Sequence, residues 1–294
     1  MQSCFQANVI CSAMFLTAMA GNPLILQLAG QLNVKLTWFL WALGAILPGL
    51  INLLIMPLFL FKLIKPNISD CENLKKLAEN HLHALGKVSK HEYLVMGVFC
   101  FLIILWILGD YLGITPATTA IIGFLILVLT RVITWEDALD EKNAWNTFIW
   151  FALFITLSNL LSGYGVTEWI GSNVQKMFIS ANIYVALPAC LLIFFFLHYF
   201  FASITVYATV MYSVFFYILI SLSVKPFIAA IVLAYFANIS GGLAHYTTSS
   251  APIFYVGSKL STKRWCYLSL LTSLVNLFLW TTVGAAWWKI LGWW

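Results

Sequence analysis

Residues 245–257 read HYTTSSAPIFYVG and interrupt a long apolar run with four consecutive hydroxyl side chains and a proline. Pro252 removes a backbone donor and clashes with the preceding helical turn. Gly241 and Gly242, just upstream, lower the cost of irregular backbone. In lipid, such an interruption persists only where protein or a water-filled cavity satisfies the freed backbone groups. The stretch therefore predicts a broken helix beside a polar site.

The composition identifies the surroundings of this stretch as a lipid bilayer. Of the 294 residues, 62% are hydrophobic and 9% are charged, whereas a soluble domain is about 45–50% apolar and about 25% charged. The net charge of +5 is then a matter of membrane topology and does not indicate a nucleic-acid partner. The six cysteines show no metal-ligand spacing, so we expect no metal site and no resident cofactor.

Several segments are long and apolar enough to cross the membrane, which takes about 20 residues. The predicted spans are 7–30, 37–61, 93–112, 115–132, 146–165, 183–222, 227–256 and 266–288. The segment 183–222 is too long for one helix, so it forms either two short spans or a re-entrant hairpin that turns near residues 202–205. The tryptophans close to the end of the sequence predict an interfacial belt: Trp287, Trp288, Trp293 and Trp294.

Basic residues predict the orientation of the spans. The loops 62–92 and 257–265 are rich in lysine and should be cytoplasmic. Counting spans from them places 133–145 inside, and 166–182 and the C-terminus outside. By the same count, 7–30 runs outward and 227–256 runs inward.

An internal repeat relates the two ends of the chain. MAGNPLI at 19–25 corresponds to TSSAPIF at 248–254, and GLINLL at 49–54 corresponds to SLVNLF at 273–278. Because the two units cross the membrane in opposite directions, they predict an inverted-topology repeat. Chance similarity between apolar helices is the alternative.

The expected domain organisation follows from this repeat. Residues 1–64 end a first repeat, 65–92 form a cytoplasmic helical arm, and 93–294 form the second repeat. Little precedes the first break, so we expect the N-terminal part of the first repeat to be absent from this sequence. The predicted fold class is all-α: a polytopic helical membrane protein with an inverted-topology repeat, a re-entrant hairpin at 183–222 and two broken helices.

The two breaks, around residues 21–23 and 247–252, are the predicted binding region, because interrupted helices mark the binding sites of many transporters. Hydroxyls donate and accept hydrogen bonds, and helix N-termini favour anions. Apart from Asp110 and Arg131 near helix ends, the spans contain no acid, lysine or arginine. This pattern favours an anion held by neutral groups. The alternative is that the hydroxyls only join helices.

Two histidines at membrane depth, His198 and His245, each precede a predicted site by a few residues. A protonated imidazole could balance an anion or couple transport to pH. Each could equally be a buried, neutral histidine that bonds a neighbouring carbonyl.

Longer motifs resemble the divalent anion:sodium symporter family, with the 2-oxoglutarate/malate translocators and citrate/succinate antiporters as the nearest branch. The resemblance rests on SAMFLTAMAGNP at 12–23, HYFFAS at 198–203, HYTT at 245–248 and APIF at 251–254, with WED at 135–137 and AWNT at 144–147. It extends over the whole chain.

The resemblance implies two re-entrant hairpins and two broken helices around a central dicarboxylate site flanked by sodium sites, with elevator-type motion. Each hairpin tip of the family carries Ser-Asn-Thr. Here the tip is Ser203-Ile204-Thr205, which keeps the hydroxyls and lacks the amide. This difference favours exchange, or a cationic role for His198 or His245, over sodium coupling.

Carried over to this sequence, the resemblance implies specific ligands. Substrate or ion binding falls on Asn22, Ser203, Thr205, Thr247, Thr248 and Ser249. The coupling ion, sodium, would bind near Asn22, Ser203, Thr205 and Thr248.

The predicted function is transport of a dicarboxylate such as 2-oxoglutarate or malate across the cell inner membrane, by exchange or sodium symport. The expected partners are the small dicarboxylate, the lipid bilayer, a second copy in a homodimer and a separately encoded N-terminal half. Two alternatives stay open: a non-transporting remnant or half of a split transporter, and an intramembrane transferase that uses His198 or His245. Neither histidine has an acid or cysteine close by in the sequence.

Overall fold

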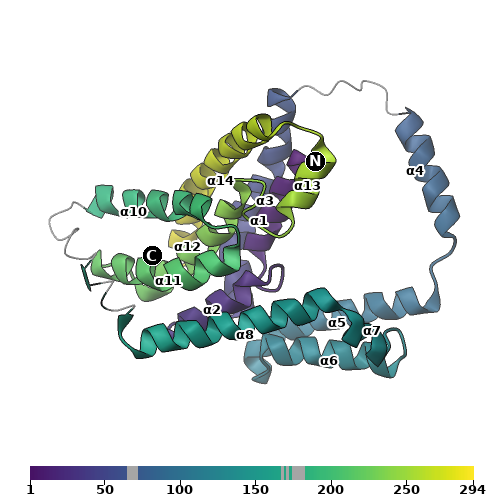
Figure 1. Cartoon of the computed structure of the whole chain (residues 1–294), viewed down its shortest axis with the longest axis horizontal. Helices are drawn as coiled ribbons and strands as arrows, with labels where there is room; N and C mark the ends of the chain where they lie inside the picture. Colours follow the sequence, from purple (N-terminus) through teal and green to yellow (C-terminus); the bar gives the residue numbers. More distant parts are fainter. Residues whose placement is uncertain (65–71, 167–168, 170–171, 174–182) are drawn as a thin grey trace. The chain divides into compact units, whose positions relative to one another are not determined.

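A computed structural model describes residues 1–64, 72–166, 169, 172–173 and 183–294 (Figure 1). Within these residues all regular structure is helical, which confirms the predicted all-α class. Five helices are long and apolar enough to cross a membrane, as expected of a polytopic protein. The chain separates into two compact units, Met1–Pro57 with Asn146–Trp294, and Leu58–Trp145.

The first unit contains the elements of both predicted breaks. Its helices are α1 (Gln2–Met14), α2 (Gly21–Gln31), most of α3 (Trp38–Leu63), most of α8 (Lys142–Gly163), α10 (Ile183–Leu197), η1 (His198–Phe200), α11 (Ile204–Ser221), α12 (Pro226–Ile239), η2 (Ser240–Gly242), α13 (Ala251–Ser258) and α14 (Thr262–Ile290).

Helix α12 is the core of this unit. Every residue from Ile228 to Ile239 is buried, as expected for a helix that is apolar on all sides. Pro226 begins the helix, where its missing N–H has no cost. Helices α1, α10, α11 and α14 all contact α12, and Figure 1 shows α10 and α11 running beside it.

Both predicted breaks are present, but each begins earlier in the chain than predicted. Residues 21–23 already belong to α2, and Ala251 and Pro252 belong to α13, because the first turn of a helix tolerates a proline. Residues 15–20, here called break 1, separate α1 from α2, and residues 243–250, called break 2, separate η2 from α13. Two glycines let the second interruption pack closely. A Cβ on Gly241 would lie 2.6 Å from Cγ2 of Thr248, and one on Gly242 would lie 2.9 Å from Oε1 of Gln6.

The segment 183–222 forms a helical hairpin, α10–η1–α11, with its turn at residues 201–203. The turn lies within one residue of the predicted position. The two helices contact each other and α12. Whether the hairpin re-enters or crosses the bilayer stays a prediction, as does the inverted direction of the two repeats.

A chain of buried amides joins the two halves of the predicted repeat. Nδ2 of Asn52 donates to Oδ1 of Asn276 at 2.9 Å, and Nδ2 of Asn276 donates to Oε1 of Gln6 at 3.0 Å. Nε2 of Gln6 donates in turn to the carbonyl of Gly242 at 3.2 Å, beside break 2. All three side chains are fully buried. The two asparagines that the repeat makes equivalent therefore contact each other directly.

Two further contacts connect each break to the opposite repeat. Nδ2 of Asn238, in α12, donates to Oδ1 of Asn22 at the start of α2, at 2.7 Å. The hydroxyl of Ser250, at the end of break 2, donates to Oδ1 of Asn8 in α1, at 2.9 Å. Asn8, which precedes break 1, thus contacts the end of break 2. Asn238, which precedes break 2, contacts Asn22, just after break 1.

The predicted tryptophan belt is wrong in part. Trp288 is 2% exposed, and its indole N–H donates to the carbonyl of Gly44 at 2.9 Å. The indole N–H of Trp287 donates to the carbonyl of Leu43 at 2.8 Å. These two rings attach α14 to α3, because a buried indole N–H requires an acceptor. Trp294 is 51% exposed, as a belt residue should be.

The second unit holds α4 (Glu72–Leu85), α5 (Lys90–Leu112), α6 (Pro116–Leu129) and α7 (Trp135–Asp140). Helices α5 and α6 pack together, and α6 is shorter than the predicted 115–132 span. Backbone and side-chain hydrogen bonds with Thr134 cap α7 and hold the pKa of Asp137 below its usual value. Within the predicted arm, residues 65–71 lie outside the described residues, and α4 covers its centre.

Substitution of Asn276 by leucine should destabilise the first unit more than any loss at the surface of α14. The change removes two buried hydrogen bonds and leaves Oε1 of Gln6 and Nδ2 of Asn52 without these partners, at a cost of about 1–3 kcal/mol. Asn52→Leu, which removes one bond, should cost less. Thermal unfolding in detergent measures both, with Thr282→Ala, at an exposed position on the same helix, as the control. Equal melting temperatures for Asn276→Leu and the control would contradict this.

Candidate functional site

A cavity of about 480 Å³ lies where the two breaks meet the turn of the hairpin. All of its lining residues belong to the first unit: Met19, Ala20, Gly21, Asn146, Trp150, Ser203, Ile204, Thr205, Val206 and Ser249. Segments separated by more than 200 positions therefore share one cavity. This volume is typical of a site for a small molecule.

Four polar side chains that line this cavity are not hydrogen-bonded to the protein. The side chains of Ser203, Thr205, Ser249 and Asn146 make no hydrogen bond to any described residue. The described lining also contains no ionised side chain. Asn146 and Ser249 are exposed, and Ser203 and Thr205 are partly buried, so these hydroxyls and the amide are free to bond a ligand or water.

Three of the predicted site residues line this cavity, Ser203, Thr205 and Ser249, and their binding of a ligand stays a prediction. Ser203 precedes the first turn of α11 and adopts an extended backbone without capping that helix, so its hydroxyl stays available. Ile204, between the two tip hydroxyls, is 4% exposed and packs against break 1. A Cβ on Gly21 would lie 3.3 Å from Cγ2 of Ile204, so the glycine permits this close packing.

Asn22 is not among the residues that line the cavity. Its side chain is fully buried, and Nδ2 donates to the carbonyls of Ser12 at 2.9 Å and Phe15 at 3.1 Å. Its Oδ1 accepts from Asn238. The amide therefore satisfies carbonyls freed where α1 ends, and it positions Gly21, its neighbour, at the cavity wall.

Thr247 and Thr248 also lie away from the cavity and hold break 2 together. The fully buried hydroxyl of Thr247 shares a hydrogen bond between the carbonyls of Gly241 at 2.6 Å and Ala244 at 2.9 Å. Oγ1 of Thr248 accepts from the N–H of Ala251 at 3.2 Å. That bond satisfies one of the unpaired donors at the start of α13. Of the predicted hydroxyl run, Ser249 alone lines the cavity.

The two histidines occupy different surroundings. His198 is fully buried, stacks on Tyr207 with ring centroids 4.4 Å apart, and places Nδ1 2.7 Å from the hydroxyl of Ser240. Ser240 donates to the carbonyl of Ala237, so Nδ1 carries the proton of a neutral ring in this arrangement. His245 is partly buried and packs against Tyr246 and Tyr255. Neither lines the cavity, and a charged role for either stays a prediction.

Asn146 and Trp150 of α8, with the backbone of residues 19–21, were absent from the predicted site. The motif at 144–147 pointed to the region without assigning it a role. Their position beside the tip depends on packing between segments far apart in the sequence, which no local pattern shows. Asn146 supplies the cavity with an amide, the kind of group that the tip lacks at Ile204.

Chemically, the cavity suits a small anion held without charge neutralisation by a side chain. Its free hydroxyls can donate to carboxylate oxygens. Helix α2 begins at Gly21, on the cavity wall, and the N-terminus of a helix carries partial positive charge. For sodium, the hydroxyls are oxygen ligands, but the described residues form no group of metal-binding side chains, so an ion site stays a prediction.

Comparison with known proteins assigns the chain to a family. Residues 1–294 match the sodium:sulfate symporter transmembrane region. The chain belongs to this family. The family is one of transporters, so the intramembrane transferase considered from the sequence is excluded.

Individual relatives of this symporter family match over the full chain. Dicarboxylate transporter 1 of the chloroplast is 39% identical over 298 residues in Arabidopsis thaliana and 37% identical over 297 residues in Spinacia oleracea. Inner membrane protein YbhI of Escherichia coli (strain K12) is 32% identical over 297 residues. The matches cover 100% of this chain and 53%, 52% and 62% of these relatives. The chain thus spans about half the length of these relatives.

Cysteines introduced in the hydroxyl positions should divide into two classes. Ser203→Cys and Ser249→Cys face the cavity and should react with a polar maleimide at least about tenfold faster than Thr247→Cys, which is buried. Mass spectrometry of the labelled peptides gives the rates and separates them from the exposed native thiols of Cys4 and Cys100. Equal rates at all three positions would show that no such cavity exists.

Proposed function

We propose that this chain forms a dicarboxylate-binding half of a membrane transporter that exchanges dicarboxylates such as 2-oxoglutarate and malate, or moves them with sodium. The observation that carries the proposal is the cavity in which Ser203, Thr205 and Ser249 present free hydroxyls beside the start of α2. The Arabidopsis and spinach relatives are named as dicarboxylate transporters, which agrees with this chemistry.

Two carboxylates can be accommodated at different walls of the cavity. One wall has the hairpin-tip hydroxyls of Ser203 and Thr205, and another has Ser249 of break 2. A hydrogen bond from a neutral hydroxyl to a charged oxygen is stronger than one between neutral groups. Because no cationic side chain binds the substrate, its release does not require a buried ion pair to separate, and the free-energy cost of release stays low.

The hairpin supplies a means of opening the site. Ser203 and Thr205 lie at its turn, while Ser249 and Gly21 lie in the broken helices. We propose that the hairpin and broken helices move together, in the elevator manner that the resemblance implied. Because the relatives are about twice as long, transport is proposed for a protein that contains this chain, with a homodimer as its expected assembly.

The proposed location is the inner membrane of the cell. The described part of the chain has five apolar helices of spanning length, and one bacterial relative is named as an inner membrane protein. Fluorescent protein fused to the chain and imaged in its native cell tests this location.

Replacing the tip hydroxyl of Ser203 by hydrogen should weaken malate binding. Loss of one charge-assisted hydrogen bond costs about 1.5–3 kcal/mol, which corresponds to roughly 10- to 100-fold in affinity. Scintillation-proximity binding of labelled malate to the purified chain measures the dissociation constant for Ser203→Ala. Uptake of the same label by vesicles then measures transport.

Thr282→Ala is the matched control, because it also removes one hydroxyl but lies at an exposed position outside the cavity. Its affinity should equal that of the unaltered chain. Competition by succinate and 2-oxoglutarate, but not by acetate, should accompany binding. Unaltered malate affinity in Ser203→Ala would refute a site at the hairpin turn.

A further inference from the structure

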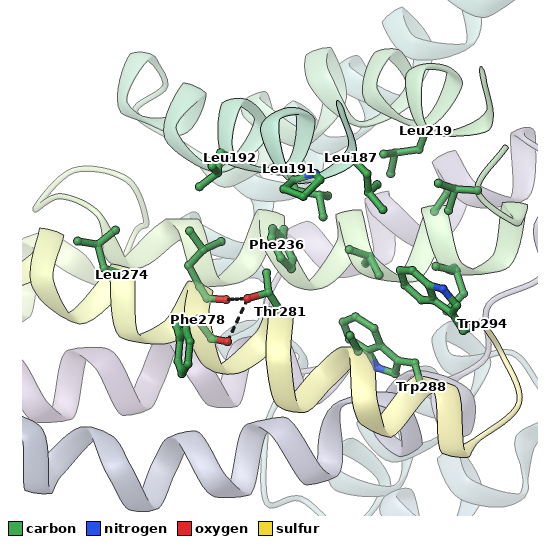
Figure 2. A pocket seen from close by; sticks show the side chains of 17 residues that line it. Leu187, Leu191, Leu192, Leu219, Phe236, Leu274, Phe278, Thr281, Trp288 and Trp294 are labelled. Atoms are coloured by element: carbon green, nitrogen blue, oxygen red, sulfur yellow. Dashed lines mark hydrogen bonds between the residues drawn. The ribbon is translucent and has the colours of Figure 1, made fainter. Parts of the chain in front are cut away.

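A second cavity of about 490 Å³ lies on the other side of the hairpin, between α10, α12 and α14 (Figure 2). In Figure 2, Leu187, Leu191 and Leu192 of α10 lie across the opening from Leu274 of α14, and Phe278 of α14 also lines the cavity. Phe236 of α12 forms the floor. We call this cavity the apolar groove. It shares no lining residue with the cavity of Ser203, Thr205 and Ser249, which we call the hydroxyl cavity.

Two polar groups on the walls of the apolar groove already have hydrogen-bond partners within the protein. The hydroxyl of Thr281 already donates to the carbonyls of Leu277 at 2.8 Å and Phe278 at 3.0 Å, as the dashed lines of Figure 2 show. The indole N–H of Trp288 donates to the carbonyl of Gly44. Only an apolar occupant fits such walls without desolvation cost.

One end of the apolar groove is polar and positively charged. A smaller cavity of about 210 Å³ shares Leu187, Val224, Ile228 and Trp294 with the groove, and it adds Ser223 and Lys225. Nζ of Lys225 donates to the main-chain oxygen of Trp294 at 2.8 Å. Lys225 pairs with no acidic side chain among the described residues, and its ammonium group has two further N–H donors for the oxygens of an anion.

The direction of the apolar groove suits a molecule of the bilayer. Its rim includes side chains exposed on the outside of the unit, with Leu192 42%, Leu274 43% and Phe278 63% exposed. The exposed face of a helix of spanning length, such as α14, contacts lipid chains, and the exposed Trp294 at the polar end is typical of the membrane interface. An empty apolar space also forfeits dispersion contacts.

We propose that the apolar groove binds one acyl chain of an anionic phospholipid, whose phosphate lies at Lys225 and Ser223. The chain fills the space between α10 and α14, and the headgroup remains at the interface where α12 begins. The apolar groove provides walls for the acyl chain, and the smaller cavity at its end provides one cationic side chain for the phosphate. A soluble dicarboxylate is excluded from the groove by its walls, so this site is independent of the transport proposal.

The site also has a structural consequence. The α10 arm carries the hairpin turn that lines the hydroxyl cavity, and the apolar groove separates this arm from α14. A bound acyl chain replaces missing contacts along the arm, and thereby steadies the hairpin against α12 and α14.

Photolabelling of the unaltered chain tests the proposal. The chain is placed in phosphatidylcholine nanodiscs with a small fraction of phosphatidylglycerol whose acyl chain bears a diazirine, and the cross-linked peptides are mapped by mass spectrometry. Labels should concentrate on the groove walls of α10 and α14. Excess unlabelled phosphatidylglycerol should displace them, whereas inorganic phosphate should not.

Two adjacent alanines provide a matched pair of variants. Ala285 lines the apolar groove and Ala286 does not. Ala285→Phe should reduce the specific labelling about tenfold, because the ring occupies the space of the acyl chain, whereas Ala286→Phe should leave it unchanged.

A second pair separates the headgroup from the chain. Lys225→Gln should lower the preference for phosphatidylglycerol over phosphatidylcholine about fivefold, and Lys289→Gln, at an exposed position outside the two cavities, should not.

Labelling that is even along the exposed helices, or that Ala285→Phe does not reduce, overturns the proposal. Should Ala285→Phe fail to fold, displacement by unlabelled phosphatidylglycerol on the unaltered chain decides the matter alone. Specific displacement by a soluble apolar compound but not by phospholipid would identify a different occupant and refute a lipid site.

Discussion

The fold of the first unit depends on the need to satisfy backbone groups where two helices stop inside an apolar protein. Carbonyls freed at break 1 are bonded by Asn22, and those at break 2 by Thr247 and Gln6. In a membrane no water is present to replace such partners. Buried amides and hydroxyls are therefore required wherever the helices are interrupted, and these residues form the frame on which the cavity is built.

That frame links the two predicted repeats rather than stabilising each separately. Asn52 contacts its predicted counterpart Asn276, and Asn238 contacts Asn22. A shift of one broken helix must then move or break an amide contact with the other. The geometry of the hydroxyl cavity is consequently a property of both repeats, which explains why its walls come from segments so far apart in sequence.

Polar side chains thus divide into those that hold the breaks and those that face the cavity. The division is visible in their hydrogen bonds, since Thr247 is bonded within break 2 while Ser203 and Ser249 bond no described residue. The apolar groove is different from both groups. Among the described residues that line it or the smaller cavity at its end, Lys225 alone is charged. One hairpin therefore borders two cavities of opposite polarity.

The sequence by itself determined the membrane class, the two breaks, the hairpin turn and the repeated asparagines, because proline, small residues and hydroxyls in apolar runs are local signals. The hydroxyl positions Ser203, Thr205 and Ser249 followed from the resemblance to the symporter family. Only the tertiary structure decided that Asn22 and Thr247 are turned to the backbone, that Trp288 is buried, and that α8 adds Asn146 to the cavity. Which way a polar side chain points inside a helix bundle depends on the neighbours that pack against it, and those neighbours are set by contacts between distant segments.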